Sequence, residues 1–291
     1  MSQVASIPAP PRPAIQANVA AALAEDLGGG DVTAALLPDT DDIAYLLCKQ
    51  EAVVAGRPWF DACILALDPD AMIQWRVDEG DRVKAGTVLA TLAGRSRALV
   101  SAERSALNFL QTLSGTATVT AAFVDAVRGT GAQILDTRKT LPGLRLAQKY
   151  AVRVGGGVNH RIGLFDAVML KENHIRAFGS VAAAIRVARA AQPTLPLIVE
   201  VESLAQLREA LDEGCDRILI DDFDTATRRE AVRIADGRIP LEVSGSVGLD
   251  HVRAIAEDGV DCISIGALTK HVRAIDLSMK LGPVPAQFGG H

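Results

Sequence analysis

The chain contains few cysteines and none of the common nucleotide-binding motifs. Its cysteines, Cys48, Cys63, Cys215 and Cys262, are far apart and form no Cys-x-x-Cys pair, so neither a zinc site nor a disulfide framework is indicated. No Gly-x-x-x-x-Gly-Lys or Gly-x-Gly-x-x-Gly segment occurs, so the sequence does not indicate a bound nucleoside triphosphate or an intact dinucleotide. Reduced thiols fit a cytoplasmic protein best.

Long apolar segments are also missing. A long uncharged run, 105–123, contains Asn108, Gln111 and several Ser and Thr residues, which make it too polar to span a membrane. The first residues, MSQVASIPAPPRP, have no basic start and no apolar segment, unlike a secretory signal. With 291 residues, 49% hydrophobic and 22% charged, the chain is expected to be soluble and long enough for two domains.

The first part of the chain reads as a mixture of helices and short strands. Ile15, Val19 and Leu23 recur every four residues and predict an amphipathic helix over 14–27 that stops at the glycines 28–30. Another helical pattern covers 59–67, and a longer one runs from 101 to 127. The runs typical of strands are 43–48, 52–55 and 72–77.

The segment 77–89, with Glu-Gly-Asp followed by a glycine turn, resembles the hairpins of lipoyl and biotinyl carrier domains. A carrier needs an exposed lysine at the tip of the hairpin, and none stands there. We therefore predict a hairpin with a structural role.

From residue 131 onward, strand patterns alternate with helix patterns. The six strand-like runs end near Asp136, Leu170, Val201, Ile220, Val243 and Ile265. The helical patterns between them include 181–191, 204–212, 225–235 and 249–258. This alternation predicts parallel strands joined by helical crossovers. Because six units are too few for an eight-stranded barrel, we expect an incomplete or smaller α/β barrel.

Positive charge is concentrated in residues 136–174. This stretch has seven Lys or Arg residues against three acidic ones, a balance of +4 in a chain whose formal net charge is −5. Arg138 and Lys139 follow one strand-like run, and Lys171 follows another. In parallel α/β folds the carboxyl ends of the strands form the rim at which substrates bind. The glycines 155–157 allow a close approach of the backbone and deliver Asn159, His160 and Arg161 to the same rim.

Two more strand ends carry carboxylates, and two carry glycine loops. Glu200 and Asp221 follow consecutive runs, where they could hold a divalent metal, bind sugar hydroxyls, or act as acid and base on a glycoside. The loops 244–248 and 266–267 each precede a helix, whose free backbone amides can cradle a phosphate. Together these features fit a phosphorylated sugar and a second anionic molecule.

These residues also carry a resemblance to a known family. The motifs DTRKT-x-PGLR, GGG-x-NHR-x-GL-x-D and LK-x-NHI, in this order, are similar to those of the quinolinate phosphoribosyltransferases. The resemblance extends to the segments 25–33, 103–108, 114–115 and 264–269. It therefore covers nearly all of the chain after the first dozen residues.

The resemblance implies an α/β fold with an incomplete, six- or seven-stranded parallel α/β barrel at 114–275. It also implies an N-terminal α+β sandwich domain at 1–113, to which the segment 276–291 returns. The implied enzyme is a pentosyltransferase of de novo NAD biosynthesis, a nicotinate-nucleotide diphosphorylase (carboxylating). It converts quinolinate and phosphoribosyl pyrophosphate to nicotinate mononucleotide, pyrophosphate and carbon dioxide. The expected cofactor is Mg²⁺, and the expected partner is a second copy of the chain, with no nucleic acid or membrane involved.

The resemblance also suggests a role for each site residue. Arg138, His160 and Arg161 would bind quinolinate together with Lys171, and Arg104 would reach the site of the neighbouring subunit. Lys139 and Lys171 would stabilise the departing pyrophosphate, while Glu200 and Asp221 would hold the ribose hydroxyls or the metal. Further substrate contacts are expected from Thr137, Ser244, Gly245, Ser246 and Gly266.

Some positions depart from the family pattern. Asp222 stands where Asn is usual, Ser246 where a second Gly is common, and Lys270-His271 where His-Ser is common. The surroundings of the phosphate and the metal are therefore expected to be tuned differently. Asn173 and His174 match the pattern, and either loop geometry or ligand contact would explain them equally well.

Three alternatives remain open. The first is a paralogue of the same fold with another acceptor, such as the family members associated with molybdenum transport, although the combination of Arg138-Lys139 with His160-Arg161 argues against it. The second is a barrel lyase or aldolase that uses Lys139 or Lys171 as a Schiff-base nucleophile. The third is a phosphosugar-binding protein without catalysis, which the presence of both acids and both lysines makes the weakest.

Overall fold

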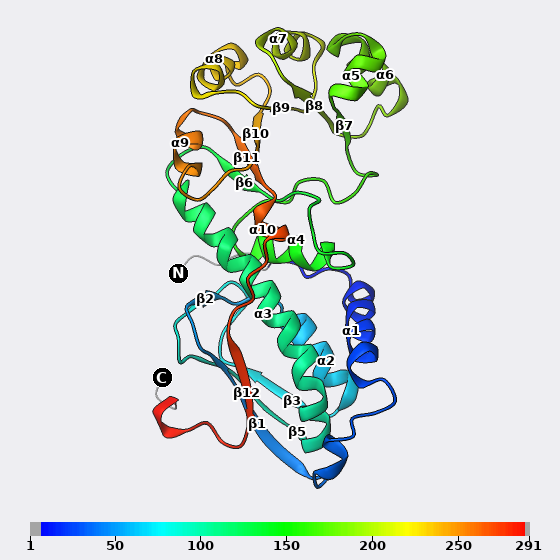
Figure 1. Cartoon of the computed structure of the whole chain (residues 1–291), viewed down its shortest axis with the longest axis vertical. Helices are drawn as coiled ribbons and strands as arrows, with labels where there is room; N and C mark the ends of the chain where they lie inside the picture. Colours follow the sequence, from blue (N-terminus) through cyan, green and yellow to red (C-terminus); the bar gives the residue numbers. More distant parts are fainter. Residues whose placement is uncertain (1–6, 289–291) are drawn as a thin grey trace. The chain divides into compact units, whose positions relative to one another are not determined.

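The computed structural model describes residues 7–288, which form two compact units (Figure 1). Unit 1 contains 7–121, Leu141–Gly156 and 271–288, and unit 2 contains Ala122–Thr140 and Gly157–Lys270. The sequence analysis assigned 141–156 to the catalytic domain, whereas in the structure this segment packs in unit 1. Most of its buried apolar side chains belong to the main hydrophobic cluster of that unit. Neither unit is therefore one continuous stretch of chain.

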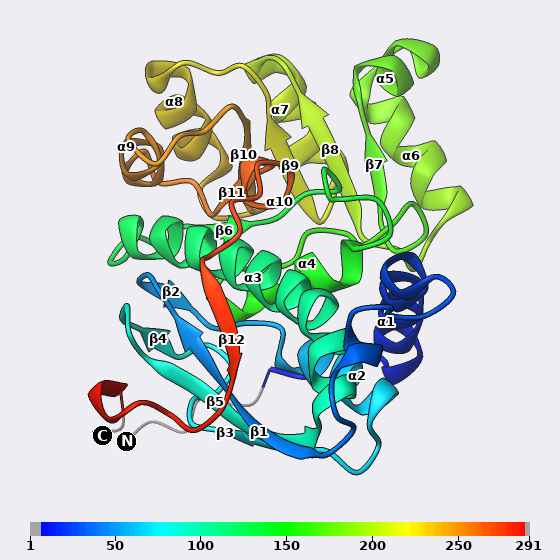
Figure 2. The ribbon, with the colours of Figure 1, turned by 60° about the horizontal axis from the view of Figure 1, so that its bottom comes forward.

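The main sheet of unit 1 is antiparallel, with the strand order β12-β1-β5-β3. Its strands are β1 (Asp41–Cys48), β3 (Met72–Trp75), β5 (Val88–Arg95) and β12 (Leu277–Leu281). Tyr45 of β1 pairs with Lys280 on one side and with Thr91 on the other. The segment after residue 276 thus adds a strand to the N-terminal sheet, seen in red beside β1 in Figure 2, while 289–291 lie outside the described residues.

No tight hairpin forms within 77–89, although the strands that flank this segment, β3 and β5, are antiparallel neighbours. β4 (Arg82–Val83) pairs with β2 (Ala52–Val53) in a separate two-stranded sheet. Val88 and Leu89 instead belong to β5, which pairs with β1 and β3. Gly80 and Gly86 both have positive φ, 89° and 88°, so the chain turns on each side of β4. Because the chain turns twice, residues 82–83 and residues 88–89 join different sheets.

Four helices and two short 3-10 turns complete unit 1. They are α1 (Arg12–Leu27), η1 (Ala34–Leu36), α2 (Arg57–Leu67), α3 (Ser96–Ala126), α4 (Arg145–Val154) and η2 (Ala286–Phe288). The predicted stripe of α1 is confirmed, because Ile15, Val19 and Leu23 are buried in the core. Trp59 and Phe60 of α2 are completely buried in the same cluster. The last residues of α3 belong to unit 2.

A carboxylate from a distant segment caps the N-terminus of α2. The N-cap residue, Gly56, has φ 109° and no side chain with which to cap the helix. Glu79 replaces it, accepting hydrogen bonds from the amides of Gly56 (3.0 Å) and Arg57 (2.6 Å). Burial raises the pKa of Glu79 to about 7, although these hydrogen bonds favour the ionised form.

Unit 2 contains a six-stranded parallel sheet in the order β6-β11-β10-β9-β8-β7. Its strands are β6 (Gln133–Leu135), β7 (Val168–Leu170), β8 (Leu197–Val201), β9 (Arg217–Ile220), β10 (Leu241–Gly245) and β11 (Cys262–Ile265). All six predicted strands are confirmed. β6 and β7 stand at the two edges and do not pair with each other among the described residues, so the parallel barrel is incomplete.

The helices of unit 2 follow the strands as crossovers (Figure 1). They are α5 (Glu172–Phe178), α6 (Val181–Ala191), α7 (Leu204–Glu213), α8 (Thr225–Ala235), α9 (Val252–Glu257) and α10 (Ala267–Lys270). Three of them begin at a side-chain cap: Ser180, Ser203 and Asp224 accept hydrogen bonds from backbone amides of the first turn. Ser203 and Asp224 thus mark the ends of the loops after β8 and β9, whereas Ser180 marks the end of the turn between α5 and α6.

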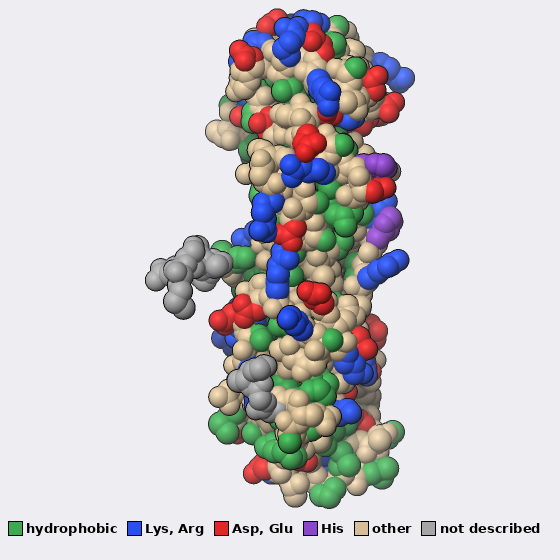
Figure 3. Space-filling view, turned by 90° about the vertical axis from the view of Figure 1, so that its left-hand side faces the viewer, with side chains coloured by type: hydrophobic (Ala, Val, Ile, Leu, Met, Phe, Trp, Pro, Cys, Tyr) green, Lys and Arg blue, Asp and Glu red, His purple; other side chains and the backbone are tan. Residues whose placement is uncertain are grey.

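The surface shows no broad area of one charge on the face drawn in Figure 3, where Lys and Arg side chains are interspersed with Asp and Glu. Within residues 7–288, no helix is both long and apolar enough to cross a membrane. The cations of 136–174 are divided between the two units: those at 145, 149 and 153 lie on α4 of unit 1, whereas those at 138, 139, 161 and 171 lie in loops of unit 2.

Candidate active site

The loop after β6 is joined to the loop that carries Asn159 and His160. Asp136, completely buried, accepts hydrogen bonds from the Asn159 side-chain amide (2.6 Å) and from the backbone amide of His160 (2.8 Å). Leu135 also forms a parallel bridge with Val158. The structure thus brings two of the three predicted motifs together at the end of β6, as the sequence analysis expected.

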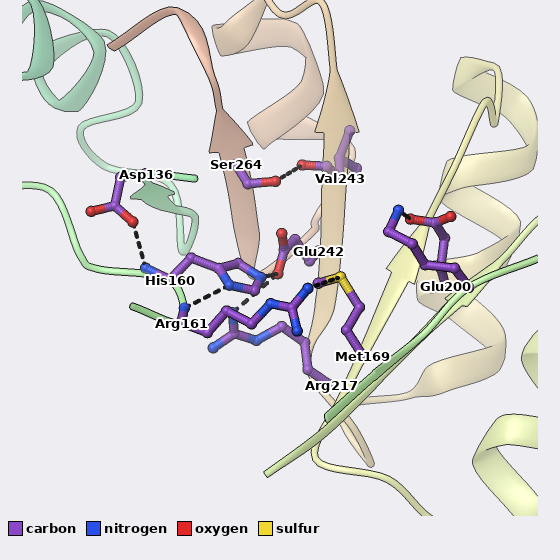
Figure 4. A network of polar contacts seen from close by, with 10 residues as sticks. Asp136, His160, Arg161, Met169, Glu200, Arg217, Glu242, Val243 and Ser264 are labelled. Atoms are coloured by element: carbon purple, nitrogen blue, oxygen red, sulfur yellow. Dashed lines mark hydrogen bonds and ion pairs between the residues drawn. The ribbon is translucent and has the colours of Figure 1, made fainter. Parts of the chain in front are cut away.

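Both nitrogens of the buried His160 ring contact protein groups (Figure 4). Nδ1 accepts a hydrogen bond from the backbone amide of Arg161 at 2.7 Å. Nε2 lies 3.3 Å from Oε2 of Glu242, which is itself 3.0 Å from Nη1 of Arg217. An acceptor at Nδ1 must be unprotonated, so the proton of the neutral ring is on Nε2 and points at Glu242.

Arg161 and Arg138 form a pair of neighbouring cations. Nη1 of Arg161 donates to the Ala167 carbonyl at 3.3 Å, and Nη2 lies 3.6 Å from Sδ of Met169 on β7. Burial lowers the pKa of Arg161, and repulsion from Arg138 lowers it further. An anion between these two guanidinium groups would relieve the repulsion. The pair is therefore suited to binding a carboxylate-bearing ligand.

Lys171, at the end of β7, lies against the carboxylate of the neighbouring strand. Its Nζ is 2.6 Å from Oε2 of Glu200, which is on β8 and 7% exposed. Burial raises the pKa of Glu200, Lys171 lowers it, and Asp221, at the end of β9, raises it again. The two predicted carboxylates are thus close enough to repel each other, which a cation or a network of hydroxyl donors would offset.

Lys139 packs against the loop after β11. A Cβ added to Gly266 would come within 2.8 Å of the Lys139 side-chain Cδ and 3.6 Å of the Thr137 hydroxyl. Thr137 accepts a hydrogen bond from the Lys139 amide, and Thr269 donates to the Lys139 carbonyl. The absence of a side chain at Gly266 therefore leaves room for Lys139 to lie across the loop that was predicted to bind phosphate.

A pocket of about 710 Å³ opens at the ends of β9 and β10. Its lining includes Asp221, Asp222, Ser244, Gly245 and Ser246, together with Arg228 of α8 and His251. Gly245 has φ 138°, a conformation that favours glycine. The pocket joins one predicted carboxylate to one predicted phosphate loop.

Arg104 was predicted to contribute to the site of a neighbouring subunit, whereas either loop geometry or ligand contact would explain His174. Arg104 is exposed on α3, in the part of that helix that belongs to unit 1. His174 accepts a hydrogen bond from the Lys171 amide at 3.1 Å, which accounts for it through loop geometry.

Within the described residues no group of three or more His, Cys, Asp or Glu side chains could hold a metal ion. A metal at Glu200 and Asp221 would thus need substrate or water oxygens as further ligands.

Comparison with known proteins agrees with this arrangement. The profile of the quinolinate phosphoribosyl transferase N-terminal domain matches residues 31–114, and that of the C-terminal domain matches residues 116–280. The chain belongs to the quinolinate phosphoribosyltransferase family. It is 46% identical over 271 residues to a nicotinate-nucleotide pyrophosphorylase [carboxylating] of Mycobacterium leprae, covering 89% of this chain and 94% of that protein.

Other members of this family are similar in sequence and in structure. A quinolinate phosphoribosyltransferase [decarboxylating] of Nicotiana tabacum is 40% identical, with 94% of this chain and 84% of that protein covered. The solved structure of the nicotinate-nucleotide pyrophosphorylase of Francisella tularensis superposes with a TM-score of 0.91 at 42% identity. That superposition covers 96% of this chain and 99% of the other.

One departure from the family pattern has a structural explanation. Asp222 has φ 57°, in the left-handed region that few residues other than glycine adopt. Asn and Asp tolerate this conformation best, because their short polar side chains can bond locally. Replacing the usual Asn by Asp therefore preserves the backbone and changes only the charge at the pocket.

Two residues of this arrangement were not predicted: Glu242, which contacts the His160 ring, and Arg217, which contacts Glu242. A signal for Glu242 was present, since it is a charged residue between Leu241 and Val243 in an otherwise apolar strand. Arg217 begins β9 and gave no such signal, because a cation at the start of a strand is usually solvated.

Proposed function

We propose that the chain is a quinolinate phosphoribosyltransferase (decarboxylating) of NAD biosynthesis. It would convert quinolinate and phosphoribosyl pyrophosphate to nicotinate mononucleotide, pyrophosphate and carbon dioxide. The observation that carries the proposal is the pair of guanidinium groups, Arg138 and Arg161, of which Arg161 contacts the strand that precedes Lys171. Quinolinate has two carboxylates, and a cluster of three cations suits a dianion better than a molecule with one carboxylate.

The phosphoribosyl group would occupy the ends of β8 to β11. The loop Ser244, Gly245 and Ser246 is the candidate for the 5′-phosphate, with Gly266 as a second backbone contact, and Glu200 and Asp221 are candidates for the ribose hydroxyls. The two carboxylates also suit Mg²⁺, which when bound would neutralise charge on the pyrophosphate. Lys139, lying against Gly266, is positioned to stabilise the same departing charge.

The reaction follows from this arrangement. Arg138 and Arg161 orient quinolinate so that its ring nitrogen attacks C1 of the ribose, and the bond from C1 to the pyrophosphate oxygen breaks. The ring nitrogen then carries a positive charge. The adjacent carboxylate leaves as carbon dioxide, its bonding electrons pass to the ring carbon, and that carbon takes a proton. The cationic ring stabilises these electrons, so no separate cofactor is needed for the decarboxylation.

A side-by-side assay tests this function. The protein is incubated with phosphoribosyl pyrophosphate and Mg²⁺, with either quinolinate or nicotinate, and nicotinate mononucleotide, pyrophosphate and carbon dioxide are measured. We expect product from quinolinate with one carbon dioxide per turnover, and loss of product on chelation of Mg²⁺. Arg161→Gln should lose activity, while Arg186→Gln, on the exposed face of α6, should not. Turnover of nicotinate alone would refute the proposal.

The lyase alternative predicts a different result. A lysine that forms a Schiff base must attack as a neutral amine, whereas Nζ of Lys171 forms an ion pair with Glu200 at 2.6 Å. We expect no covalent adduct when the protein is treated with borohydride in the presence of carbonyl substrates. Trapping of a substrate on Lys171 or Lys139 would favour the lyase instead.

We further propose a cytoplasmic homodimer in which Arg104 of one subunit completes the site of the other. Arg104 is exposed on α3, and Leu164 and Phe165, in the loop held by Asp166, are each 74% exposed. Apolar side chains this exposed are typical of an interface. Mixing refolded Arg104→Ala and Lys171→Ala subunits should restore about one quarter of wild-type activity, because half of the random dimers carry one intact site. No recovery on mixing would contradict the shared site.

A further inference from the structure

The Glu242 carboxylate lies inside unit 2. It is 0% exposed and is the second residue of β10, in the half of the strand that precedes the Ser244 loop. Its neighbours in the strand, Leu241 and Val243, are buried in the core. A buried carboxylate is costly unless charged or hydrogen-bonding partners compensate it, and an apolar side chain at this position would avoid that cost. The position therefore calls for an explanation beyond packing.

Glu242 is connected to Arg161, one of the two neighbouring cations of the site, through the His160 ring. Arg217 holds the carboxylate at 3.0 Å, and Nε2 of His160 lies 3.3 Å from the same oxygen, Oε2. Burial raises the pKa of Glu242, but the hydrogen bonds donated by His160, Ser264 and Arg217 outweigh burial, so that the net shift is downward. The group is therefore an anionic acceptor, and it favours a proton on Nε2 of His160.

In the neutral ring, whether Nε2 carries the proton determines whether Nδ1 accepts or donates a hydrogen bond. With the proton on Nε2, Nδ1 is an acceptor and holds the Arg161 backbone amide at 2.7 Å. In the other tautomer Nδ1 would carry a proton and face the Arg161 N–H, so that two donors would oppose each other. The backbone of His160 is already fixed by Asp136 at 2.8 Å. The orientation and tautomer of the ring therefore decide whether the Arg161 backbone amide is held in this position (Figure 4).

We propose that Glu242, held by Arg217, is a positioning residue: it fixes the His160 ring in the Nε2–H tautomer so that Nδ1 holds the Arg161 amide and sets the place of its guanidinium group. This inference rests on the proposed function only for the identity of the ligand that Arg161 binds. It also assigns His160 a different task from the one implied by the family resemblance. His160 acts through Arg161, because both of its ring nitrogens are engaged within the protein.

The first test needs no activity. In protein labelled with ¹⁵N at histidine, the two ring nitrogens of His160 report the tautomer directly, and a His160→Asn variant identifies their signals among the five histidines of the chain. We expect a protonated Nε2 and an unprotonated Nδ1 in the wild-type protein. In Glu242→Leu we expect the Nδ1–H form or a mixture of tautomers. A wild-type His160 with its proton on Nδ1 would overturn the proposal, whether or not the chain turns over quinolinate.

The second test separates positioning from general damage. Glu242→Gln keeps an oxygen acceptor and should raise the KM for quinolinate only a few-fold, whereas Glu242→Leu should raise it about 10-fold or more, because a hydrogen bond to a charged acceptor is lost. The KM for phosphoribosyl pyrophosphate should change little in both. Glu257→Gln, in an exposed ion pair on α9, is the matched control and should change neither value.

Other outcomes would refute the proposal. Equal losses for both substrates, or equal losses in the Gln and Leu variants, would show that Glu242 merely supports the fold. If Glu242→Leu does not fold, the wild-type and Glu242→Gln spectra still decide the tautomer. If no variant, including the wild type, turns over quinolinate while the tautomer is as expected, the proposed function fails and the positioning role stands.

Discussion

The raised pKa of Glu79 predicts how the free energy of unfolding depends on pH, in both sign and size. Its carboxylate caps α2 through the amides of Gly56 and Arg57, and burial raises its pKa from 4.5 to about 7. The folded protein therefore holds this proton more tightly than the unfolded chain does. As the pH rises from about 4.5 to 7, the unfolded state loses its proton first, so the free energy of unfolding falls across this range and is constant above it.

The size follows from the difference in pKa. Each pKa unit corresponds to about 1.4 kcal/mol, so the complete titration destabilises the wild-type protein by at most about 3.5 kcal/mol. Glu79→Gln removes the titration, and its amide oxygen can still accept from both backbone amides. The variant should therefore gain stability relative to the wild type between pH 5 and pH 8. Glu79→Ala loses the cap as well, at a cost of about 1 kcal/mol at both pH values.

Melting curves at pH 5 and pH 8 measure this difference. For a chain of this size a change of 1 kcal/mol moves the melting temperature by about 2–4 °C. The gap between Glu79→Gln and the wild type should therefore widen by several degrees from the lower to the higher pH. Glu257→Gln, which removes an exposed carboxylate, should show no such widening. If the Glu79→Gln gap is the same at both pH values, the carboxylate is already ionised at pH 5 and the reasoning is wrong.

Two glycines give further predictions. Gly266→Ala would place a methyl group 2.8 Å from the Lys139 side chain. Activity should fall about 10-fold while the melting temperature changes little, because a lysine side chain can move aside. Unchanged activity would show that the position of Lys139 does not matter. Gly155→Ala would bring Cβ within 2.5 Å of the Ala117 carbonyl on α3, and urea titrations should show a destabilisation of about 1–3 kcal/mol. Gly131→Ala is the control, because the space around Gly131 is open, and it should not destabilise the fold. Equal effects of the two substitutions would refute this account.

The sequence predicted the elements of unit 2 well, because each is bounded by a strong local signal. The strand that ends at Ile220, for example, is a short apolar run between a helix and an acidic residue, and the helix that follows begins at the cap Asp224. Parallel strands then force the ends of consecutive runs to one edge. That is why Lys171 and Glu200, whose positions in the chain are distant, were expected near each other and are in contact.

The failures have equally physical causes. The segment 77–89 has the local signals of a hairpin, but which strand pairs with which depends on packing between distant parts of the chain. The segment 141–156 follows a strand of unit 2, and only its apolar face, which includes Tyr150, decides that it packs in unit 1. Glu242 was missed because its partners, His160 and Arg217, become neighbours only through the order of strands in the sheet.

The pairing of β12 with β1 has a consequence for how the chain is made. During translation β1 emerges early, whereas β12 follows only after the whole of unit 2 has left the ribosome. Until then one edge of β1 exposes unpaired backbone groups that can recruit strands from other nascent chains. The acidic pair Asp41 and Asp42 at the start of this strand works against such recruitment through charge repulsion. The sheet that begins the protein is thus among the last parts to be completed.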